Sequence, residues 1–480
     1  MPDTLPTQVR VVVVGGGIAG CSVAYHLAKL GWRDVLLLEQ GELAGGTTWH
    51  AAGMVGRLRT SSSMTRINDA SARLYAALEA ETGHPTGWKQ VGSLVVARTE
   101  ERMVQLRRTA GTAEYLGVAI ELIDGRAARA KWPLMRADDL LGAAWLPDDG
   151  KVIPKETATA LAIGARRRGV TVRENVRVLD ILHQNRRATG VRTAEGDVAA
   201  GCVVICGGMW TRQLALRCGV NLPLYPVEHH YVVSNPIPGA FDELPCTRDP
   251  DAGIYFRGEG DAVLLGAFQN VTKAWLVDRV PDDFKFQLLG PDWEHFAPPL
   301  AEGKHRIPAL AEYGIARFVN GPESFTPDNE FLLGESAELR GLFVAAGFNS
   351  AGIACGGGAG EALAQWIVGG EQPFDLWSVD VRRFTPAHNN RAFLRARVTE
   401  TLGLHYQTAW PNREVETGRG LRRSPLHDRL AARGACFGQK AGFERPLWFA
   451  AREGEAPAEP SRGVGVPASA GLREDRLKPG

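Results

Sequence analysis

Three glycines near the start of the chain have the spacing that a dinucleotide phosphate requires. They form the segment Gly15-x-Gly17-x-x-Gly20, directly after the apolar run Val11–Val14. The first glycine allows a tight turn, the second lets the backbone approach a pyrophosphate, and the third lets the next helix pack closely on the sheet. Because the first N–H groups of that helix are free to bind phosphate oxygens, the turn predicts a nucleotide cofactor.

An acidic residue follows at the distance expected for a ribose contact. Glu39 ends the second apolar run, Val35–Leu38, and lies 19 residues after Gly20. A carboxylate there accepts hydrogen bonds from a ribose diol, and its charge disfavours the 2′-phosphate of NADP. NAD and FAD both remain open on this pattern. The predicted cofactor contacts of this segment are Gly15, Gly17, Ile18, Ala19, Gly20, Glu39 and Gln40.

The loop after the second strand favours FAD over NAD. Residues 45–53 read GGTTWHAAG, and such small and hydroxyl-bearing side chains suit a loop packed against a large planar cofactor. An NAD enzyme more often continues directly into another strand–helix–strand unit. The loop also contains His50, and a neutral imidazole is a good nucleophile near pH 7.

The residues Thr47-Thr48-Trp49-His50-Ala51-Ala52-Gly53 resemble a motif of the dimethylglycine and sarcosine dehydrogenases, within the D-amino-acid-oxidase-like flavoproteins. This resemblance extends over roughly residues 9–450 and implies FAD bound covalently, from the flavin 8α-methyl carbon to the imidazole of His50. For His50 taken alone, a hydrogen-bonded core histidine is the alternative. The flavin contacts that the resemblance implies here are Gly46, Thr47, Thr48, Trp49, His50, Ala51, Ala52, Gly53 and Met54.

Distant segments agree with this resemblance. Val178 matches a position whose backbone meets the adenine, and Trp210 belongs to a Gly-x-Trp turn beside the cofactor. The stretches 325–328, 333–335 and 347–352 resemble the family's C-terminal flavin motif. Its strand-to-helix turn would aim N–H groups and a helix N-terminus at the pyrimidine edge of the flavin, with a simple loop as the alternative. The contacts expected at this turn are Gly347, Asn349, Ser350, Ala351 and Gly352.

Candidate substrate residues lie where short alternating runs predict an antiparallel sheet. His229 matches the family's active-site histidine, although His230 follows it where the family has Gln. Neighbouring strand residues point to opposite faces, so only one of these histidines can face the flavin, and no third ligand for a metal is evident. Tyr255 is expected to hydrogen-bond the substrate, and Arg257 is a candidate partner for a substrate carboxylate. A structural role is the alternative for each.

The resemblance implies an FAD-dependent oxidoreductase that acts on an N-methylated amino acid of the dimethylglycine or sarcosine type. Hydride transfer to flavin N5 gives an imine, which water cleaves to formaldehyde. Two alternatives stay open: an amino-acid oxidase or proline-type dehydrogenase with noncovalent FAD, and a truncated, non-catalytic flavoprotein. The acceptor is oxygen or an electron-transfer flavoprotein. No folate site is expected in this chain, since the resemblance ends near residue 450.

A scaffold of two parts must hold these residues. The strand, helix and strand over residues 11–39, with later apolar strands at 198–205 and 341–346, predict a Rossmann-like α/β domain. A short helix is expected at 361–368. We predict an oxidoreductase domain (1–385), a small module (386–450) and a disordered tail (451–480). Within the oxidoreductase domain, the FAD-binding segments are expected at about 1–85, 150–215 and 325–385. The antiparallel substrate segments are expected at about 86–149 and 216–324.

Composition excludes several classes of partner. The 480 residues include 55 Lys and Arg against 54 Asp and Glu, and this net charge of +1 gives no electrostatic reason to expect nucleic acid or an anionic membrane. The seven cysteines contain no Cys-x-x-Cys pair, which argues against a disulfide scaffold or a structural zinc site. No stretch reaches the ~20 apolar residues of a membrane span. We therefore expect a cytoplasmic protein without a metal.

Overall fold

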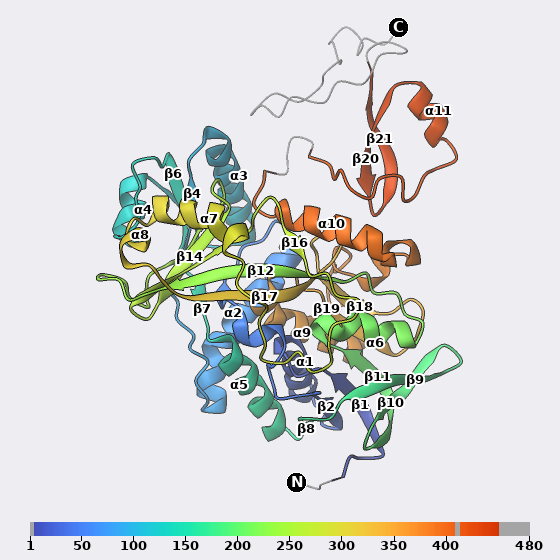
Figure 1. Ribbon diagram of the computed structural model, residues 1–480. Helices are drawn as coiled ribbons and strands as arrows, with labels where there is room; N and C mark the ends of the chain where they lie inside the picture. Colours follow the sequence, from blue (N-terminus) through green and yellow to red (C-terminus); the bar gives the residue numbers. More distant parts are fainter. Residues whose placement is uncertain (1–3, 409–412, 451–480) are drawn as a thin grey trace.

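The computed structural model describes residues 4–408 and 413–450 of the chain. Figure 1 shows two sheets with helices around them, and a small C-terminal hairpin apart from both sheets. The tail expected at 451–480 lies outside the described residues. In the described ranges, no helix has the length and apolar character needed to cross a membrane.

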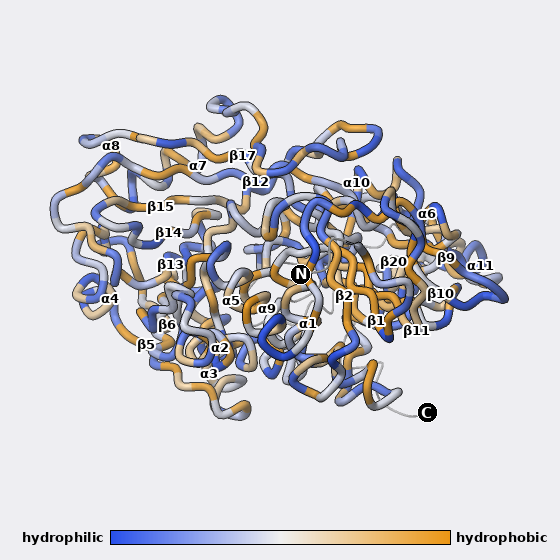
Figure 2. Tube along the Cα trace, turned by 90° about the horizontal axis from the view of Figure 1, so that it is seen from below, coloured by the Kyte–Doolittle hydropathy of each residue, from blue (hydrophilic) through white to orange (hydrophobic). Residues whose placement is uncertain are grey.

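A mostly parallel sheet begins with the first strand of the chain. Its strands follow the order β18–β19–β11–β1–β2–β8, and each neighbouring pair is parallel except β18 with β19. Val, Leu and Ile dominate these strands, as expected for strands buried on both faces, and Figure 2 shows β1 and β2 as apolar segments. The strands are β1 (Gln8–Val14), β2 (Val35–Leu38), β8 (Thr171–Arg173), β11 (Gly196–Ile205), β18 (Leu332–Glu335) and β19 (Leu342–Ala346).

Alternate side chains of β1 pack into different layers. Val11 and Val13 belong to a core that contains helices, whereas Val12 and Val14 belong to a core on the opposite face. This is the Rossmann-like arrangement that the sequence predicts. The helices of the first layer are α1 (Ile18–Lys29), α2 (Ser62–Thr82), α5 (Pro154–Arg167) and α9 (Gly352–Gly369), and the second layer contains β9 (Val178–Gln184), β10 (Arg187–Thr193) and α6 (Thr211–Arg217).

The second sheet is antiparallel except for one parallel pair, β4 with β13. Its strands follow the order β16–β12–β15–β14–β13–β4–β6–β5, and β17 also pairs with β12. The strands are β4 (Ser93–Ala97), β5 (Glu121–Ile123), β6 (Gly142–Leu146), β12 (Tyr225–Ser234), β13 (Cys246–Asp249), β14 (Ile254–Glu259), β15 (Ala262–Ala267), β16 (Lys273–Ala274) and β17 (Ile315–Phe325). Around it lie α3 (Glu100–Leu116), α4 (Gly125–Lys131), α7 (Trp293–Arg306) and α8 (Ala309–Tyr313).

The long strand β17 brings the two sheets together. Its register sets Gly321 opposite His229 of β12 and Asn320 opposite His230. β17 contacts η1 (Thr47–His50), the short helical turn that contains the candidate flavin ligand. The chain then turns back into β18 of the parallel sheet. Two shorter strands, β3 (Met54–Val55) and β7 (Gly150–Lys151), pair beside this junction.

The C-terminal segment adds a helix to the substrate sheet and a separate hairpin. The helix α10 (Arg391–Gly403) buries Phe393, Leu394 and Val398 in one core with β12 and β15. The hairpin consists of β20 (Ala435–Lys440) and β21 (Phe443–Phe449), next to α11 (His427–Ala432) at the top of Figure 1. The domain ranges, including the boundary at residue 385, stay predictions.

The helix expected at 361–368 begins earlier than predicted, because α9 starts at Gly352. A Cβ atom at Gly358 would collide with the carbonyl oxygen of Ile67 in α2, and one at Gly360 would collide with Ser22 in α1. The prediction was wrong because the glycines at 356–358 and 360 have low helix propensity, so local propensity places the start of the helix too late. Here their missing side chains allow three helices to approach one another.

Candidate active site

The glycine turn between β1 and α1 is built by close backbone contacts. Gly15 has a φ of 109°, and a Cβ atom there would lie 2.5 Å from the carbonyl oxygen of Cys206. A Cβ atom at Gly20 would collide with the carbonyl oxygen of Gly15. Gly20 therefore does not line the adjacent cleft but brings the start of α1 against the turn. Gly17, the N-cap residue of α1, has no side chain, and the first N–H group of the helix, at Ile18, donates a hydrogen bond to Thr48 Oγ1 at 3.1 Å.

Glu39 presents a fixed carboxylate at the end of β2. Its two oxygens accept hydrogen bonds from the backbone N–H groups of Gly16, at 2.6 Å, and Gly41, at 2.9 Å. Burial raises the pKa of Glu39, and the two N–H donors oppose that shift. The carboxyl is thus held by the glycine turn itself, beside the position expected for a ribose.

A dinucleotide cleft extends from this turn across the end of the parallel sheet. It also reaches charged groups that the sequence did not single out, among them Arg177, Asp282 and Lys285. The expected cofactor residues that line the cleft are Gly15, Gly17, Ile18, Ala19, Glu39, Gln40, Gly46, Thr47, Thr48, Ala51, Val178, Trp210, Gly347, Asn349, Ser350 and Gly352.

The loop before α9 supplies a second helix N-terminus to the dinucleotide cleft. Asn349 and Ser350 both have positive φ angles, 50° and 65°, a conformation that L residues adopt at a cost. The side chain of Asn349 holds the loop, because it accepts a hydrogen bond from the N–H of Thr326 at 2.8 Å and donates one to Gly347 O at 2.6 Å. The N-cap of α9, Ala351, makes no side-chain cap. Free N–H groups therefore face the cleft here too.

An inner cavity of about 90 Å³ adjoins the dinucleotide cleft. Both share wall residues at Ala51, Glu323, Asn349, Ser350 and Ile353. The other expected flavin residues that line the inner cavity are His50, Ala52, Gly53, Met54 and Ala351. Trp49 lines neither space, and its ring packs against His50 and Phe286 instead.

His50 is buried and fits against β17 at a glycine. Burial lowers the pKa of His50 to about 4, so the imidazole is neutral at physiological pH. A Cβ atom at Gly321 would collide with Cε1 and Nδ1 of this ring. The missing side chain at position 321 therefore makes the space that the imidazole occupies.

His229 and Tyr255 meet across the inner cavity. His229 Nε2 and the Tyr255 hydroxyl lie 2.9 Å apart, and the two rings are stacked. Burial lowers the pKa of His229 to about 3 and raises the pKa of Tyr255 well above its usual range. Both side chains are therefore uncharged near pH 7. His230 lies on the other face of β12, where its ring meets His295 and Phe318.

Arg257 is not among the residues that line the inner cavity. Its guanidinium donates hydrogen bonds to the carbonyl oxygens of Ala52 and Gly258, both at 2.7 Å, and forms an ion pair with Glu259 at 2.5 Å. These bonds tie β14 to the loop after His50. The structure thus gives Arg257 partners within the protein.

Two other arginines line the inner cavity, Arg59 and Arg248. Within the described ranges, neither guanidinium has an ion-pair partner within 4.0 Å. The pKa of His405 is lowered to about 3, mainly by burial and to a smaller extent by the positive charges of these two arginines. They also act on the buried carboxyl of Asp149, which already accepts hydrogen bonds from Ser93 and from the backbone of Arg57.

Besides the apolar residues Phe268, Ile353 and Ala354, sequence reasoning missed six titratable residues of the inner cavity, although signals existed for some. Tyr231 is two residues from His229, so strand alternation puts both on one face. Glu323 precedes the flavin motif at 325–328. No local pattern points to the other four, which come from loops and strand ends far apart in the chain. The missed titratable residues are Arg59, Tyr231, Arg248, Glu323, His405 and Tyr406.

A family model described as FAD dependent oxidoreductase matches residues 10–366 of the chain. The chain belongs to this family of FAD dependent oxidoreductases. A second model, described as the FAD dependent oxidoreductase central domain, matches residues 369–424. This second match covers α10 and the start of the small C-terminal module.

Curated relatives of this oxidoreductase include two named as amine-oxidising enzymes. The 4-methylaminobutanoate oxidase (formaldehyde-forming) of Paenarthrobacter nicotinovorans is 46% identical, over 94% of this chain and 54% of the relative. The mitochondrial sarcosine dehydrogenase of Homo sapiens is 40% identical, over 94% of this chain and 50% of the relative. The mitochondrial pyruvate dehydrogenase phosphatase regulatory subunit of Mus musculus is also 40% identical, over 93% and 51%. The chain spans about half the length of these relatives.

Among solved structures, the L-proline dehydrogenase of P. horikoshii has a similar fold. The TM-score is 0.71 at 26% identity, over 79% of this chain and 98% of that chain. The similar part thus comprises most of the described oxidoreductase, which supports the two-sheet fold class predicted from the sequence.

The dinucleotide cleft fits the FAD of this family. Two helix N-termini face it, at α1 and α9, and each offers backbone N–H groups and a positive dipole end to an anionic group, although Ile18 N of α1 also donates a hydrogen bond to Thr48 Oγ1. The Glu39 carboxylate lies near the first of them. A dinucleotide needs such a site for its diphosphate, and a flavin needs a second one where reduction adds negative charge.

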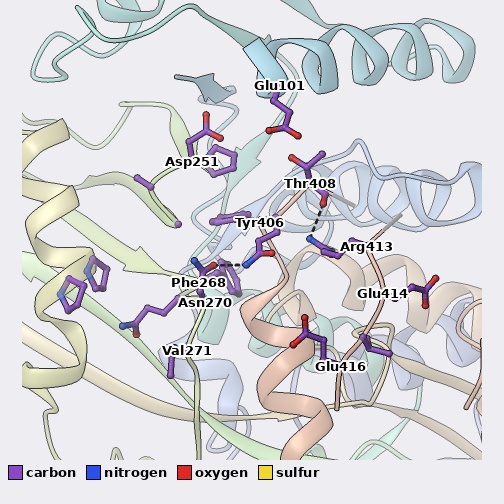
Figure 3. A pocket seen from close by; sticks show the side chains of 18 of the residues that line it. Glu101, Asp251, Phe268, Asn270, Val271, Tyr406, Thr408, Arg413, Glu414 and Glu416 are labelled. Carbon is purple, nitrogen blue, oxygen red and sulfur yellow. Dashed lines mark hydrogen bonds between the residues drawn. The ribbon is translucent and has the colours of Figure 1, made fainter. Parts of the chain in front are cut away.

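A larger outer cavity, of about 880 Å³, lies beyond the inner cavity of this oxidoreductase. Figure 3 shows Glu101 of α3, Asp251 of the loop after β13, and Glu414 and Glu416 of the C-terminal segment around it. The inner and outer cavities share the side chains of Phe268 and Tyr406. The two rings pack at 4.9 Å, and Phe268 also stacks on His405. These rings form a partition between the two spaces.

Metal ligands are not gathered in any part of the chain that the structure describes. No group of three or more His, Cys, Asp or Glu residues there could hold a metal ion.

Proposed function

We propose that the chain catalyses FAD-dependent oxidative N-demethylation of a small N-methylated amino acid of the dimethylglycine or sarcosine type, with formaldehyde as a product. The observation that carries this proposal is the inner cavity, where Arg59 and Arg248, which have no ion-pair partner among the described residues, accompany the uncharged pair His229 and Tyr255. A small amino acid needs a cationic region for its carboxylate and a polar region for its amine. The names of the two amine-oxidising relatives support this substrate class.

Each wall of the inner cavity has its own task in this proposal. FAD, when bound, supplies the hydride acceptor. Arg59 and Arg248 bind the substrate carboxylate, and Tyr255, oriented by His229, positions the amine through its hydroxyl. Phe268 and Tyr406 limit the access of water while the N-methyl group is oxidised. Water then cleaves the imine and releases formaldehyde and the demethylated amine.

The arginine pair provides the decisive experiment. Arg59→Gln and Arg248→Gln should each raise KM about 10- to 100-fold for an N-methyl amino acid, since a hydrogen bond to a charged group contributes about 1.5–3 kcal/mol. The same variants should leave KM unchanged for a matched N-methyl alkylamine that lacks the carboxylate. Arg129→Gln, an exposed residue of α4, is the control. Equal effects on both substrates would contradict carboxylate binding at these residues.

We propose further that FAD is bound covalently through His50. Three observations support it: the ring is neutral, it lies in the wall of the inner cavity, and its neighbours Ala51 and Thr48 line the dinucleotide cleft. Acid precipitation tests the bond, because covalent flavin stays with the denatured protein. Flavin released by the wild type would favour an amino-acid oxidase or proline-type dehydrogenase with noncovalent FAD.

A non-catalytic flavoprotein is the second candidate, and the relative named as a regulatory subunit favours it. It predicts bound FAD whose absorbance no N-methylated amine bleaches under anaerobic conditions. For the active enzyme we propose oxygen as the acceptor, because one relative is named as an oxidase. Turnover in air that depends wholly on an added electron-transfer flavoprotein would contradict that choice.

A further inference from the structure

Glu323 is a carboxyl group at the junction of the dinucleotide cleft and the inner cavity. It lies on β17, two residues after the glycine that accommodates His50, so the same face of the strand presents both positions. Its side chain contributes to the walls of both spaces. Only 7% of the residue is exposed. Within residues 4–408 and 413–450, the one hydrogen bond to its carboxylate is a long bond from Ser350 Oγ, at 3.4 Å.

The groups around Glu323 are poor proton acceptors near pH 7. From η1 and β12 come His50 and His229, whose pKa values are lowered by burial to about 4 and about 3. His405, after α10, has a pKa lowered by burial to about 3. These three imidazoles hold a proton only in acid. The remaining groups of the inner cavity that bear on charge are the phenols of Tyr231, Tyr255 and Tyr406 and the guanidiniums of Arg59 and Arg248.

The phenols are protonated in the same range, and two of them lie close to Glu323. Burial raises the pKa of Tyr231 and of Tyr255, and the negative charge of Glu323 adds to both shifts. Burial raises the pKa of Tyr406 to about 12. A proton leaving the substrate at neutral pH therefore has few acceptors among these side chains.

We propose that the Glu323 carboxylate accepts the proton of the substrate ammonium group. The inference rests on the proposed function. An N-methyl amino acid is an ammonium ion in water, and an ammonium nitrogen has no lone pair to assist the loss of hydride. In the step proposed, an N–H bond of the ammonium breaks, an O–H bond forms on Glu323, and the electron pair stays on nitrogen. No electron is transferred.

The electrostatics of the inner cavity favour this step. The substrate carboxylate pairs with Arg59 and Arg248, while its ammonium pairs with Glu323. Proton transfer then converts a buried cation and anion into two neutral groups, which a low-dielectric cavity stabilises. Burial also raises the pKa of Glu323 to about 7. The carboxyl is ionised and able to accept a proton above that pH, and it is protonated and inactive as the pH falls through it.

Anaerobic flavin reduction by dimethylglycine and sarcosine tests the proposal. In the wild type, the reduction rate constant should fall as the pH drops through about 7. In Glu323→Gln, the rate constant at pH 7.5 should be about 100-fold lower, in line with the usual contribution of a general base, and the decline near pH 7 should vanish. A Glu323→Gln variant with the wild-type rate and the wild-type pH profile would overturn the proposal.

Glu330→Gln is a matched control. Burial raises the pKa of Glu330 to about 7 as well, yet this residue lines none of the three cavities. Its variant should keep the wild-type profile. If Glu330→Gln alone removed the decline near pH 7, the titrating group would be Glu330 and the assignment to Glu323 would be wrong.

A binding measurement tests the same contact without turnover. Glycine betaine carries a carboxylate and a permanent cation but no N–H bond, so it should bind more tightly to the wild type as the pH rises through 7. Glu323→Gln should lose this pH dependence. If Glu323→Gln is purified without flavin, Glu323→Asp replaces it in the reduction experiment. A decline of the reduction rate constant at a different pH from the wild type supports the proposal, and a decline at the same pH overturns it. A wild type that no N-methylated amine reduces overturns both the proposed function and this inference.

Discussion

The imidazole of His50 occupies a space that a larger residue at position 321 would fill. Gly321 lies opposite His229 in the pairing of β17 with β12, so one glycine borders both the candidate flavin ligand and the candidate substrate residues. At the residue scale, the active site thus depends on an absent side chain as much as on those present. The arginines also differ in their partners: Arg257 has hydrogen bonds and an ion pair within the protein, whereas Arg59 and Arg248 have no ion-pair partner among the described residues.

Gly321→Ala should separate cofactor binding from cofactor attachment. The new methyl group would push the imidazole of His50 away, and a displacement of about 1 Å can slow a reaction roughly 100-fold. We expect the variant to retain noncovalent FAD while little flavin stays with acid-precipitated protein. Flavin fluorescence of the denatured protein measures this.

Gly290→Ala is the control for that experiment, since a Cβ atom there has no neighbour within 4 Å. It should carry as much covalent flavin as the wild type. Complete attachment in Gly321→Ala would show that the ring needs no such space.

At the scale of elements, the glycines of α9 determine how three helices pack. Ser22 Oγ of α1 donates a hydrogen bond to Gly357 O at 2.9 Å, and Gly358 N donates one to Ser71 Oγ of α2 at 2.8 Å. The helices can approach this closely because Gly357, Gly358 and Gly360 of α9 have no side chains at the crossing. The same helix begins at the loop of Asn349 and Ser350, so its position also fixes one end of the dinucleotide cleft.

Gly358→Ala should therefore destabilise the protein although alanine is the better helix former. Its methyl group would meet the carbonyl oxygen of Ile67, and overpacking in a core typically costs about 1–3 kcal/mol. Urea denaturation of the flavin-loaded protein measures the loss in the free energy of unfolding.

The matched variant is Gly369→Ala, in the last turn of the same helix, where a Cβ atom has no neighbour within 4 Å. It should be neutral or slightly stabilising. A Gly358→Ala protein as stable as the Gly369→Ala protein would contradict the close packing of α9 on α2.

On the scale of the whole molecule, the active site lies where the two sheets and the C-terminal segment meet. The Phe268–Tyr406 partition joins a residue after β15 with one after α10, and the backbone carbonyl of Tyr406 accepts a hydrogen bond from Arg102 of α3 at 2.8 Å. Burial at this junction keeps several histidines uncharged. The cost of charging them couples the stability of the fold to pH.

The free energy of unfolding should fall as the pH drops from about 6.5 to 4. Burial lowers the pKa values of His26, His50, His229 and His405 to between about 3 and 4, so the unfolded chain binds protons that the folded chain does not. Their contribution is complete above pH 6.5 and is lost in acid. Burial also lowers the pKa values of His295 and His388, which adds to the trend, while five carboxyl groups with raised pKa values oppose it: Glu39, Asp149, Asp249, Glu323 and Glu330.

His405→Asn tests this linkage. Removing one such histidine should reduce the slope of stability against pH by about 1.4 kcal/mol per pH unit between pH 6 and 4.5. His183→Asn, at an exposed position of β9, should leave the slope unchanged. Urea denaturation at several pH values gives both slopes, and identical slopes for the two variants would contradict a buried, neutral His405.

Features that depend on residues close together in the chain could be predicted from the amino-acid sequence. The strand–turn–helix around Gly15–Gly20 follows from local propensity and spacing, and the structure contains it. The resemblance of the loop at His50 indicated the family, which the family model confirms. Most of the predicted contact residues line one of the two adjoining spaces.

Which charged groups line the inner cavity became known only from the three-dimensional structure. Arg59, Arg248 and Glu323 come from distant segments, and nothing in their local sequence shows whether a partner neutralises them. From its local sequence, Arg257 was as good a candidate for binding a substrate carboxylate. In the structure, however, its guanidinium donates hydrogen bonds to the carbonyl oxygens of Ala52 and Gly258. The physical reason is that burial and pairing depend on contacts between residues far apart in the chain, whereas periodicity and glycine spacing record contacts between neighbours.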